Sequence, residues 1–170
     1  FAAMAADIGT GEPVLLERGD LAGAMFASMA IPALVTPQAL DGRLLVDGGV
    51  ANNLPVDVAL AWGADVVIAV DISSPMYAPE QLTSLLTVTD QLTNLLTRTN
   101  TEARIALLRP QDVLVTPDLG GFTSVDFARL ETVIPAGRAA VLALAPALDH
   151  LRLSEQAFAA HIAAQRRTPV

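Results

Sequence analysis

A continuous apolar run at positions 66–70 constrains the fold more than any other feature of this sequence. It reads Val-Val-Ile-Ala-Val, without the polar alternation of a half-exposed strand, and is therefore typical of a strand covered on both faces. A helical pattern opens at Pro55 and ends at Gly63, just before the run. A helix followed by a buried strand predicts an α/β layered domain with a mainly parallel central sheet.

Turn residues divide the first 50 positions into short elements. Glycines, a threonine and a proline at 9–13 separate two apolar runs and predict a hairpin. Asp20 is expected to cap a helix over 21–28. Asp41-Gly42 predicts a second hairpin, because this dipeptide favours the tight turns that join antiparallel strands.

The later positions predict helices around one more strand. Leucines on one half of the helical wheel indicate a long helix over 80–108, with an interruption near Asn100. A short strand is expected at 113–115. Ala-rich helices broken by two prolines are expected over 126–148, packed against the sheet because they are apolar on most faces.

The residue types that are missing exclude much enzyme chemistry. The sequence has no cysteine and no lysine, and its two histidines are His150 and His161. Thiolate nucleophiles, Schiff bases and Cys-ligated metals are therefore excluded. The histidine spacing does not suit a helical ligand pair, so no metal site and no cofactor are expected. A proton-transfer group before residue 150 must be a carboxylate, with Tyr77 a distant second.

The net charge and the length of the chain limit the kinds of partner that it can bind. The 170 residues suit a single core, and the net charge of −8 argues against a nucleic-acid surface or adhesion to anionic membranes. No apolar run approaches the ~18 to 20 residues of a membrane span, so no transmembrane segment is expected. Cytoplasmic, secreted and cell-envelope locations all stay open.

The strongest candidate for chemistry is Asp47, followed by Gly48 and Gly49. A carboxylate at the end of an apolar strand is poorly explained by packing, and a glycine pair lets a ligand or another chain segment approach closely. The alternative is a simple strand-to-loop turn. Asn52 and Asn53 are candidates to line the same cleft. The alternative for Asn53 is to cap the helix that opens at Pro55.

A serine hydrolase normally carries its nucleophile in Gly-x-Ser-x-Gly. None of the six serines has glycines at both places: Ser28, Ser73, Ser74, Ser84, Ser124 and Ser154.

An ordered series of segments, ending well past the Asp47-Gly48-Gly49 motif, resembles the second half of a bacterial patatin-like phospholipase domain. The resemblance covers nearly the whole chain to about Leu148. The segments that carry it are 6–11, 18–21, 27–32, 41–49, 52–55, 63–71 and 112–122.

The resemblance implies a three-layer α/β/α fold, incomplete at the N-terminus, over residues 1–149. It also implies hydrolysis of a lipid or other acyl ester by a serine paired with an aspartate, without histidine. Asp47 matches the aspartate, and the serine elbow and glycine-rich loop are expected in a missing N-terminal half upstream of Phe1. The chain alone is therefore expected to be inactive.

Residues 150–170 are expected to form a helical tail or linker, whose end at Arg166-Arg167 resembles a connection to a downstream membrane-barrel domain.

Two other functions stay open. One is a non-catalytic α/β binding or scaffold module. The other is a small-molecule domain that holds a metal or sugar at acidic strand ends, Asp47 and Asp71. The Leu-rich stripe over 82–96 is expected to border an acyl groove, to act as a lid, or to pack on the sheet or on the missing half.

Overall fold

The computed structural model describes residues 1–122 and 126–165, so Ser124 and the Arg166-Arg167 tail lie outside the described residues. The strands are β1 (Ala3–Asp7), β2 (Pro13–Leu16), β3 (Gln38–Leu40), β4 (Arg43–Asp47), β5 (Ile68–Val70) and β6 (Val113–Val115). The α-helices are α1 (Leu21–Ser28), α2 (Gly49–Asn52), α3 (Val56–Ala61), α4 (Leu85–Ile105), α5 (Ile134–Ala143), α6 (Ala145–Leu148) and α7 (Glu155–Gln165). The 3₁₀ segments are η1 (Pro79–Gln81), η2 (Phe127–Val133) and η3 (Asp149–Leu151).

Both predicted hairpins are confirmed. β1 pairs antiparallel with β2, and β3 with β4. At the β3–β4 turn, Asp41 and Gly42 have φ angles of 49° and 74°, the left-handed pair that a two-residue turn requires. The predicted cap is also present, since the Gly23 N–H donates to Asp20 Oδ2 at 2.7 Å.

The α/β class is confirmed, but a mainly parallel central sheet is not. The larger sheet, ordered β2-β1-β4-β3, is antiparallel throughout, and β5 and β6 form a separate parallel pair. Short turns join β1 to β2 and β3 to β4, and such turns can connect only antiparallel neighbours. The expectation that residues 66–70 are covered on both faces is wrong for this chain, because Ile68 and Val70 are each about half exposed.

Among residues 1–122 and 126–165, an apolar cluster lies on each of the two sheets. The first contains Ala5, Val14, Ala27 and Leu45, and joins α1 to the antiparallel sheet. The second packs α3 on β5 and contains Leu54, Val56, Val67 and Ala69. Full burial of a side chain such as Leu45 stabilises the fold by about 1.5–3 kcal/mol.

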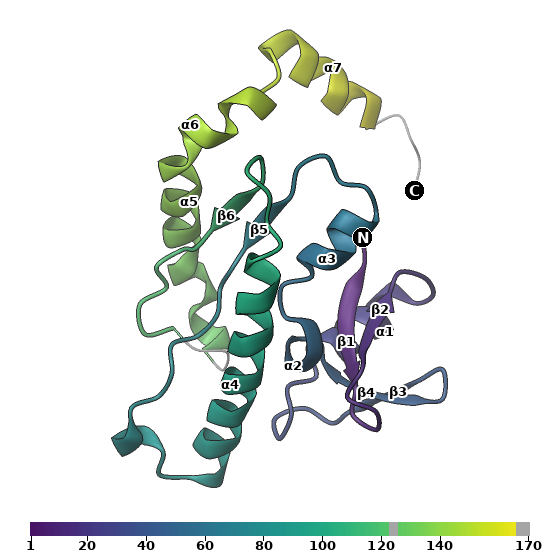
Figure 1. Ribbon diagram of the computed structural model, residues 1–170, viewed down its shortest axis with the longest axis vertical. Helices are drawn as coiled ribbons and strands as arrows, with labels where there is room; N and C mark the ends of the chain where they lie inside the picture. The colour runs from purple at the N-terminus through teal and green to yellow at the C-terminus, as the bar shows by residue number, and fades with distance from the viewer. Residues whose placement is uncertain (123–125, 166–170) are drawn as a thin grey trace.

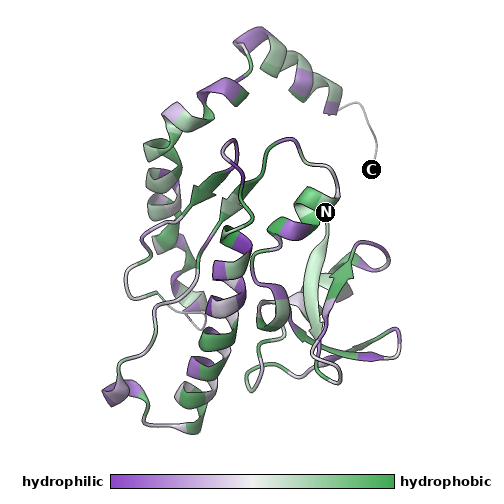
Figure 2. Ribbon diagram, viewed as in Figure 1, coloured by the Kyte–Doolittle hydropathy of each residue, from purple (hydrophilic) through white to green (hydrophobic). Residues whose placement is uncertain are grey.

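Helix α4 (labelled in Figure 1) contacts α2 through polar residues and leaves its apolar face exposed. It is continuous through Asn100, so the predicted interruption is wrong. Its contact with α2 is polar, because the Asn100 amide donates to the carbonyl of Gly49 at 2.9 Å. The apolar face is exposed, with Leu85 at 84% and Leu92 and Leu96 at 56% each. Figure 2 shows hydrophobic residues along both α4 and α5.

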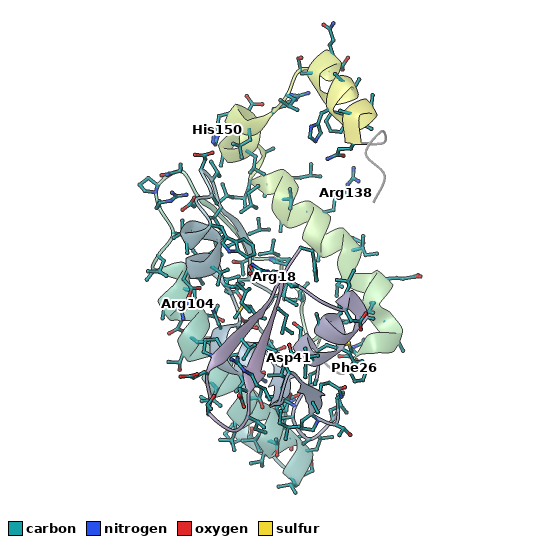
Figure 3. All side chains as sticks on the ribbon, turned by 90° about the vertical axis from the view of Figure 1, so that its right-hand side faces the viewer. Arg18, Phe26, Asp41, Arg104, Arg138 and His150 are labelled. Carbon is teal, nitrogen blue, oxygen red and sulfur yellow. The ribbon has the colours of Figure 1, made fainter. Side chains whose placement is uncertain are left out.

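Helices α5, α6 and α7 follow one another in an arch along one edge of the molecule (Figure 1). Pro135 and Pro146 lie in the first turns of α5 and α6, as predicted. The prediction that residues 126–148 pack against the sheet is wrong, because α5 and α6 contain no buried residue. His150 lies in η3, on this arch (Figure 3).

One pair of helical segments has the composition of a membrane span. No single helix among the described residues is long and apolar enough, but Ala128–Ala143 and Ala145–Leu151, bent by 64°, meet the length and hydropathy requirements together.

A clamp between Arg109 and Asp112 fixes the start of β5 beside β6. Asp112 Oδ1 accepts the Val67 N–H at 2.8 Å, and Oδ2 accepts Arg109 Nε at 2.9 Å. The guanidinium also donates to the carbonyls of Ala64 and Asp65, each at 3.0 Å. The Arg109 guanidinium, with help from the N–H groups of Arg109 and Val67, holds the pKa of the Asp112 carboxyl well below its ordinary value.

The clamp predicts acid sensitivity. A lowered carboxyl pKa contributes stability above the ordinary Asp value and loses it as pH falls toward the folded-state value, so unfolding should become easier below about pH 5. Asp112→Asn should lower the urea midpoint at pH 7 and weaken this acid dependence. The control is Glu102→Gln, which removes an exposed pair with Arg98 and should leave the midpoint nearly unchanged. Equal urea midpoints for Asp112→Asn and Glu102→Gln would contradict a stabilising role of the Arg109–Asp112 clamp.

Candidate active site

The backbone at the end of β4 is held from two sides. In the β1–β4 pairing, Asp47 lies opposite Ala5. The Asp47 N–H donates to the carbonyl of Ala30 at 2.9 Å, and the Gly48 N–H to that of Ser28 at 3.4 Å. Asp47 is thus fixed between β1 and the segment that follows α1.

Close packing against backbone, rather than an unusual dihedral angle, requires a glycine at position 48. Gly48 has φ −66° and ψ −22°, which any residue adopts. A Cβ at Gly48 would lie 2.1 Å from the carbonyl oxygen of Met4, and one at Gly49 would lie 2.8 Å from Asn53 Oδ1. The segment approaching Gly48 is therefore β1, and the chain turns directly into α2.

The Asp47 carboxylate is oriented by its own motif. The Gly49 N–H donates to Asp47 Oδ1 at 2.8 Å. Burial raises the pKa of the Asp47 carboxyl, and the Gly49 hydrogen bond opposes part of that rise. Oδ2 has no hydrogen-bond partner among the described residues. One oxygen is anchored and the other can accept a proton, which is the arrangement of a general base.

Asp47 lines a cavity of about 230 Å³ between the end of β4, the loop after β5 and α4. Asn53 lines it as well, which agrees with its assignment from the sequence to the cleft. Sequence reasoning missed the rest of the lining, because it comes from distant positions with ordinary loop or helix patterns. These residues include Ile72, Ser73, Ser74, Asp90 and Asn94.

Asn52 has a different environment from Asn53. It is buried at 2% exposure and does not line the cavity. Its Nδ2 donates to Asp57 Oδ1 at 3.0 Å, and its Oδ1 accepts from Arg104 Nε at 3.1 Å. Arg104 and Asp57 also form an ion pair at 3.5 Å, so this network ties α2 and α3 to α4.

Asn53 does not cap α3, whose first flanking residue is Pro55. Its N–H donates to Asn100 Oδ1 at 2.9 Å, and its Nδ2 to Thr101 Oγ1 at 3.0 Å. Both bonds reach α4, nearly 50 residues away in sequence. They hold α4 against the C-terminal end of α2.

The remaining candidates lie beside the cavity or far from it. Asp71 lines an adjoining cavity of about 260 Å³ and accepts the Ser73 hydroxyl at 2.5 Å. Tyr77 donates to Asp90 Oδ2 at 2.8 Å, and this bond is the main cause that raises its pKa to about 12. His150 and His161 are exposed. Across residues 1–122 and 126–165, no group of three His, Asp or Glu side chains is placed to hold a metal ion.

Comparison with known proteins adds an independent finding. The family model described as patatin-like phospholipase matches residues 6–60, from β1 through α3. Residues 6–60 are thus similar to part of a patatin-like phospholipase domain. The matched region contains Asp47, both glycines and the cavity residue Asn53.

Individual proteins of related families are also similar to parts of this chain. Two NTE family proteins of Mycobacterium tuberculosis are 39% identical over 79 residues and 43% identical over 72 residues, covering 46% and 42% of this chain. Patatin-like phospholipase domain-containing protein 7 of Rattus norvegicus is 54% identical over 50 residues, or 29% of this chain. The matches span only 22%, 12% and 4% of these relatives.

The contact at Gly48 predicts a strong effect of a single methyl group. Gly48→Ala places a Cβ against backbone atoms of β1, which cannot move without disturbing the sheet, so we expect a loss of about 3 kcal/mol or more. Gly137→Ala is the control, since its Cβ meets no atom within 4 Å and alanine favours the helix by about 1 kcal/mol. Chemical denaturation measures both. A Gly48→Ala protein as stable as the parent would refute the contact.

Burial of the Asp47 charge predicts a stabilising substitution. A raised carboxyl pKa means that stability is highest below the ordinary Asp value and falls as pH rises through the folded-state value. Asp47→Asn keeps an oxygen for the Gly49 N–H and removes the buried charge. The melting temperature of Asp47→Asn should therefore exceed that of the parent at pH 7, and the difference should vanish near pH 3. A lower melting temperature at pH 7 would count against this account.

Proposed function

We propose that this chain supplies the aspartate base of a Ser-Asp dyad in an enzyme that hydrolyses acyl esters of lipids. The observation that carries the proposal is the Asp47 carboxylate, anchored at Oδ1 by Gly49 and lining a cavity. Its place within the match to patatin-like phospholipases supports the same reading. The absence of histidine before position 150 suits a mechanism that needs none.

The proposed reaction has two halves. A serine hydroxyl attacks the ester carbonyl carbon while Asp47 accepts the hydroxyl proton, and backbone N–H groups stabilise the oxyanion. The intermediate expels the alcohol, to which Asp47 returns the proton. Water then attacks the acyl-serine, Asp47 accepts a proton from that water, and the serine leaves with the proton as the fatty acid is released.

The serine would come from a part of the protein outside these 170 residues, which contain no Gly-x-Ser-x-Gly. Exposed apolar surface supports the proposal that further residues complete the domain. Ile68 and Val70 of β5 and the leucine face of α4 are open, whereas elements of this kind are normally covered within a domain. We therefore propose that the α/β/α fold, with its mainly parallel sheet, is completed by further residues and that the 170-residue chain is inactive alone.

The test is ester hydrolysis by the full-length protein that contains this chain. Asp47→Asn should lower kcat for a short-chain ester by about 10²- to 10⁴-fold, the usual contribution of a general base. The matched control is Asp7→Asn, because Asp7 Oδ1 also accepts the N–H of a glycine two residues on, at 2.9 Å, but does not line the cavity.

Several outcomes discriminate among functions. Equal activity of Asp47→Asn and the parent would overturn the dyad, as would robust turnover by the 170 residues alone. A full-length protein that has no Gly-x-Ser-x-Gly and no activity would favour the non-catalytic binding module.

A further inference from the structure

Helix α2 presents the N–H group that orients the Asp47 carboxylate, yet it cannot hold its own position. It has only four residues, Gly49–Asn52, far fewer than the ~12 that an isolated helix needs to be stable in water. Gly48 fixes where the chain leaves β4, and the contacts of α2 with other elements fix the direction that follows. The position of the Gly49 N–H therefore depends on what is packed against α2.

One side chain of α4 binds the backbone at both ends of α2. Asn100 Nδ2 donates to the carbonyl of Gly49 at 2.9 Å and, at 3.4 Å, to that of Val50. Asn100 Oδ1 accepts the Asn53 N–H at 2.9 Å. The amide is anchored to its own helix as well, since Nδ2 donates to the Leu96 carbonyl at 3.1 Å. Because the partners of the two ends are carbonyls and an N–H, only one orientation of the amide satisfies them.

Gly49 is bound by Asn100 and itself orients the base. Its N–H donates to Asp47 Oδ1 at 2.8 Å, while its carbonyl accepts from Asn100. Thr97, one turn earlier on α4, also lies close, because its Cγ2 would be 3.2 Å from a Cβ at Gly49. Gly49 is therefore held between the end of β4 and α4. Loss of the hold from α4 would let the Gly49 N–H leave the carboxylate.

Asn100 reaches Asp47 only through Gly49. It does not line the cavity beside Asp47, and as a neutral amide it adds no charge there. The other nearby carboxylates have their own partners: Asp90 accepts from Tyr77, and Asp71 from Ser73. A change at position 100 should therefore act on the geometry of Asp47 and leave these other carboxylates as they are.

We propose that Asn100 is a positioning residue for the general base. It holds Gly49, 51 positions away in sequence, so that the Gly49 N–H keeps Asp47 Oδ1 in place and Oδ2 free to accept the serine proton. Proton transfer requires the base to lie within hydrogen-bond distance of the hydroxyl, so a displaced carboxylate loses rate. This inference rests on the proposed function.

The first measurement is ester hydrolysis by the full-length protein that contains this chain. Asn100→Ala removes the bonds to Gly49 and Asn53, and should lower kcat by about 10- to 100-fold, as expected for a misplaced catalytic group. KM should stay nearly unchanged, because Asn100 does not line the cavity.

Arg104→Met is the matched control. It removes the bond from Arg104 Nε to Asn52 Oδ1, which joins the same two helices, and leaves the buried Asn52 oxygen without this donor. Its melting temperature should fall at least as far as that of Asn100→Ala, because an unsatisfied buried acceptor is costly. Its kcat should stay close to that of the parent, because the Asn100 amide still holds Gly49.

The second measurement follows the Gly49 amide by NMR in protein labelled with ¹⁵N-glycine. In the parent this signal should shift as Asp47 titrates, because the N–H donates to that carboxylate, and it is identified as the glycine signal whose titration disappears in Asp47→Asn. The shift should be largely lost in Asn100→Ala and should persist in Arg104→Met. A general loosening of α4 would not separate the two variants in this way.

Asn100→Ser covers the case that Asn100→Ala does not fold. A serine hydroxyl there can still donate to the Leu96 carbonyl, as Thr99 does to that of Leu95 at 3.0 Å, but it is too short to replace the amide at both ends of α2. The same losses are expected.

Three results would overturn the inference and leave the proposed function standing. They are a parent-like kcat in a folded Asn100 variant, a parent-like Gly49 response in such a variant, and equal losses in Arg104→Met. Full activity of Asp47→Asn would instead overturn the proposed function, and this inference with it.

Discussion

The close approach of Gly48 to the backbone of β1 is the contact on which the site depends. Because Gly48 has no side chain, the end of β4 lies against Met4, and the chain can enter α2 immediately. That turn places the Gly49 N–H at the Asp47 carboxylate. The close packing of Gly48 on β1 therefore determines where the Gly49 N–H lies, and this N–H orients the Asp47 carboxylate.

Helix α4 completes the site through polar contacts. Asn100 accepts from the backbone of Asn53 and donates to that of Gly49, so one amide holds the helix to both ends of α2. The same helix supplies Asp90 and Asn94 to the cavity wall. Its leucines face outward and take no part in this contact. The apolar pattern of α4 therefore predicts its helicity but not the face that packs against the site.

Local features were predictable from the sequence, and long-range ones were not. The Asp41-Gly42 turn, the Asp20 cap and the helix breaks at the prolines follow from backbone preferences of a few adjacent residues. The wall formed by Ser73 and Asp90 depends on contacts between segments far apart in the chain, for which one sequence carries no pattern. Exposure of β5 was missed because periodicity reports which residues suit burial, not whether a partner covers them.

The burial of Asp47 has two consequences: it lowers the stability of the fold, and it suits the carboxylate to accept a proton. The most direct test is an NMR titration of the carboxyl carbons of the folded protein, with the Asp47 signal identified by its loss in Asp47→Asn. Our account predicts that Asp47 titrates above the ordinary Asp value of about 3.9. A pKa at or below that value would contradict it, because the carboxylate would then be solvated and poorly suited to act as a base.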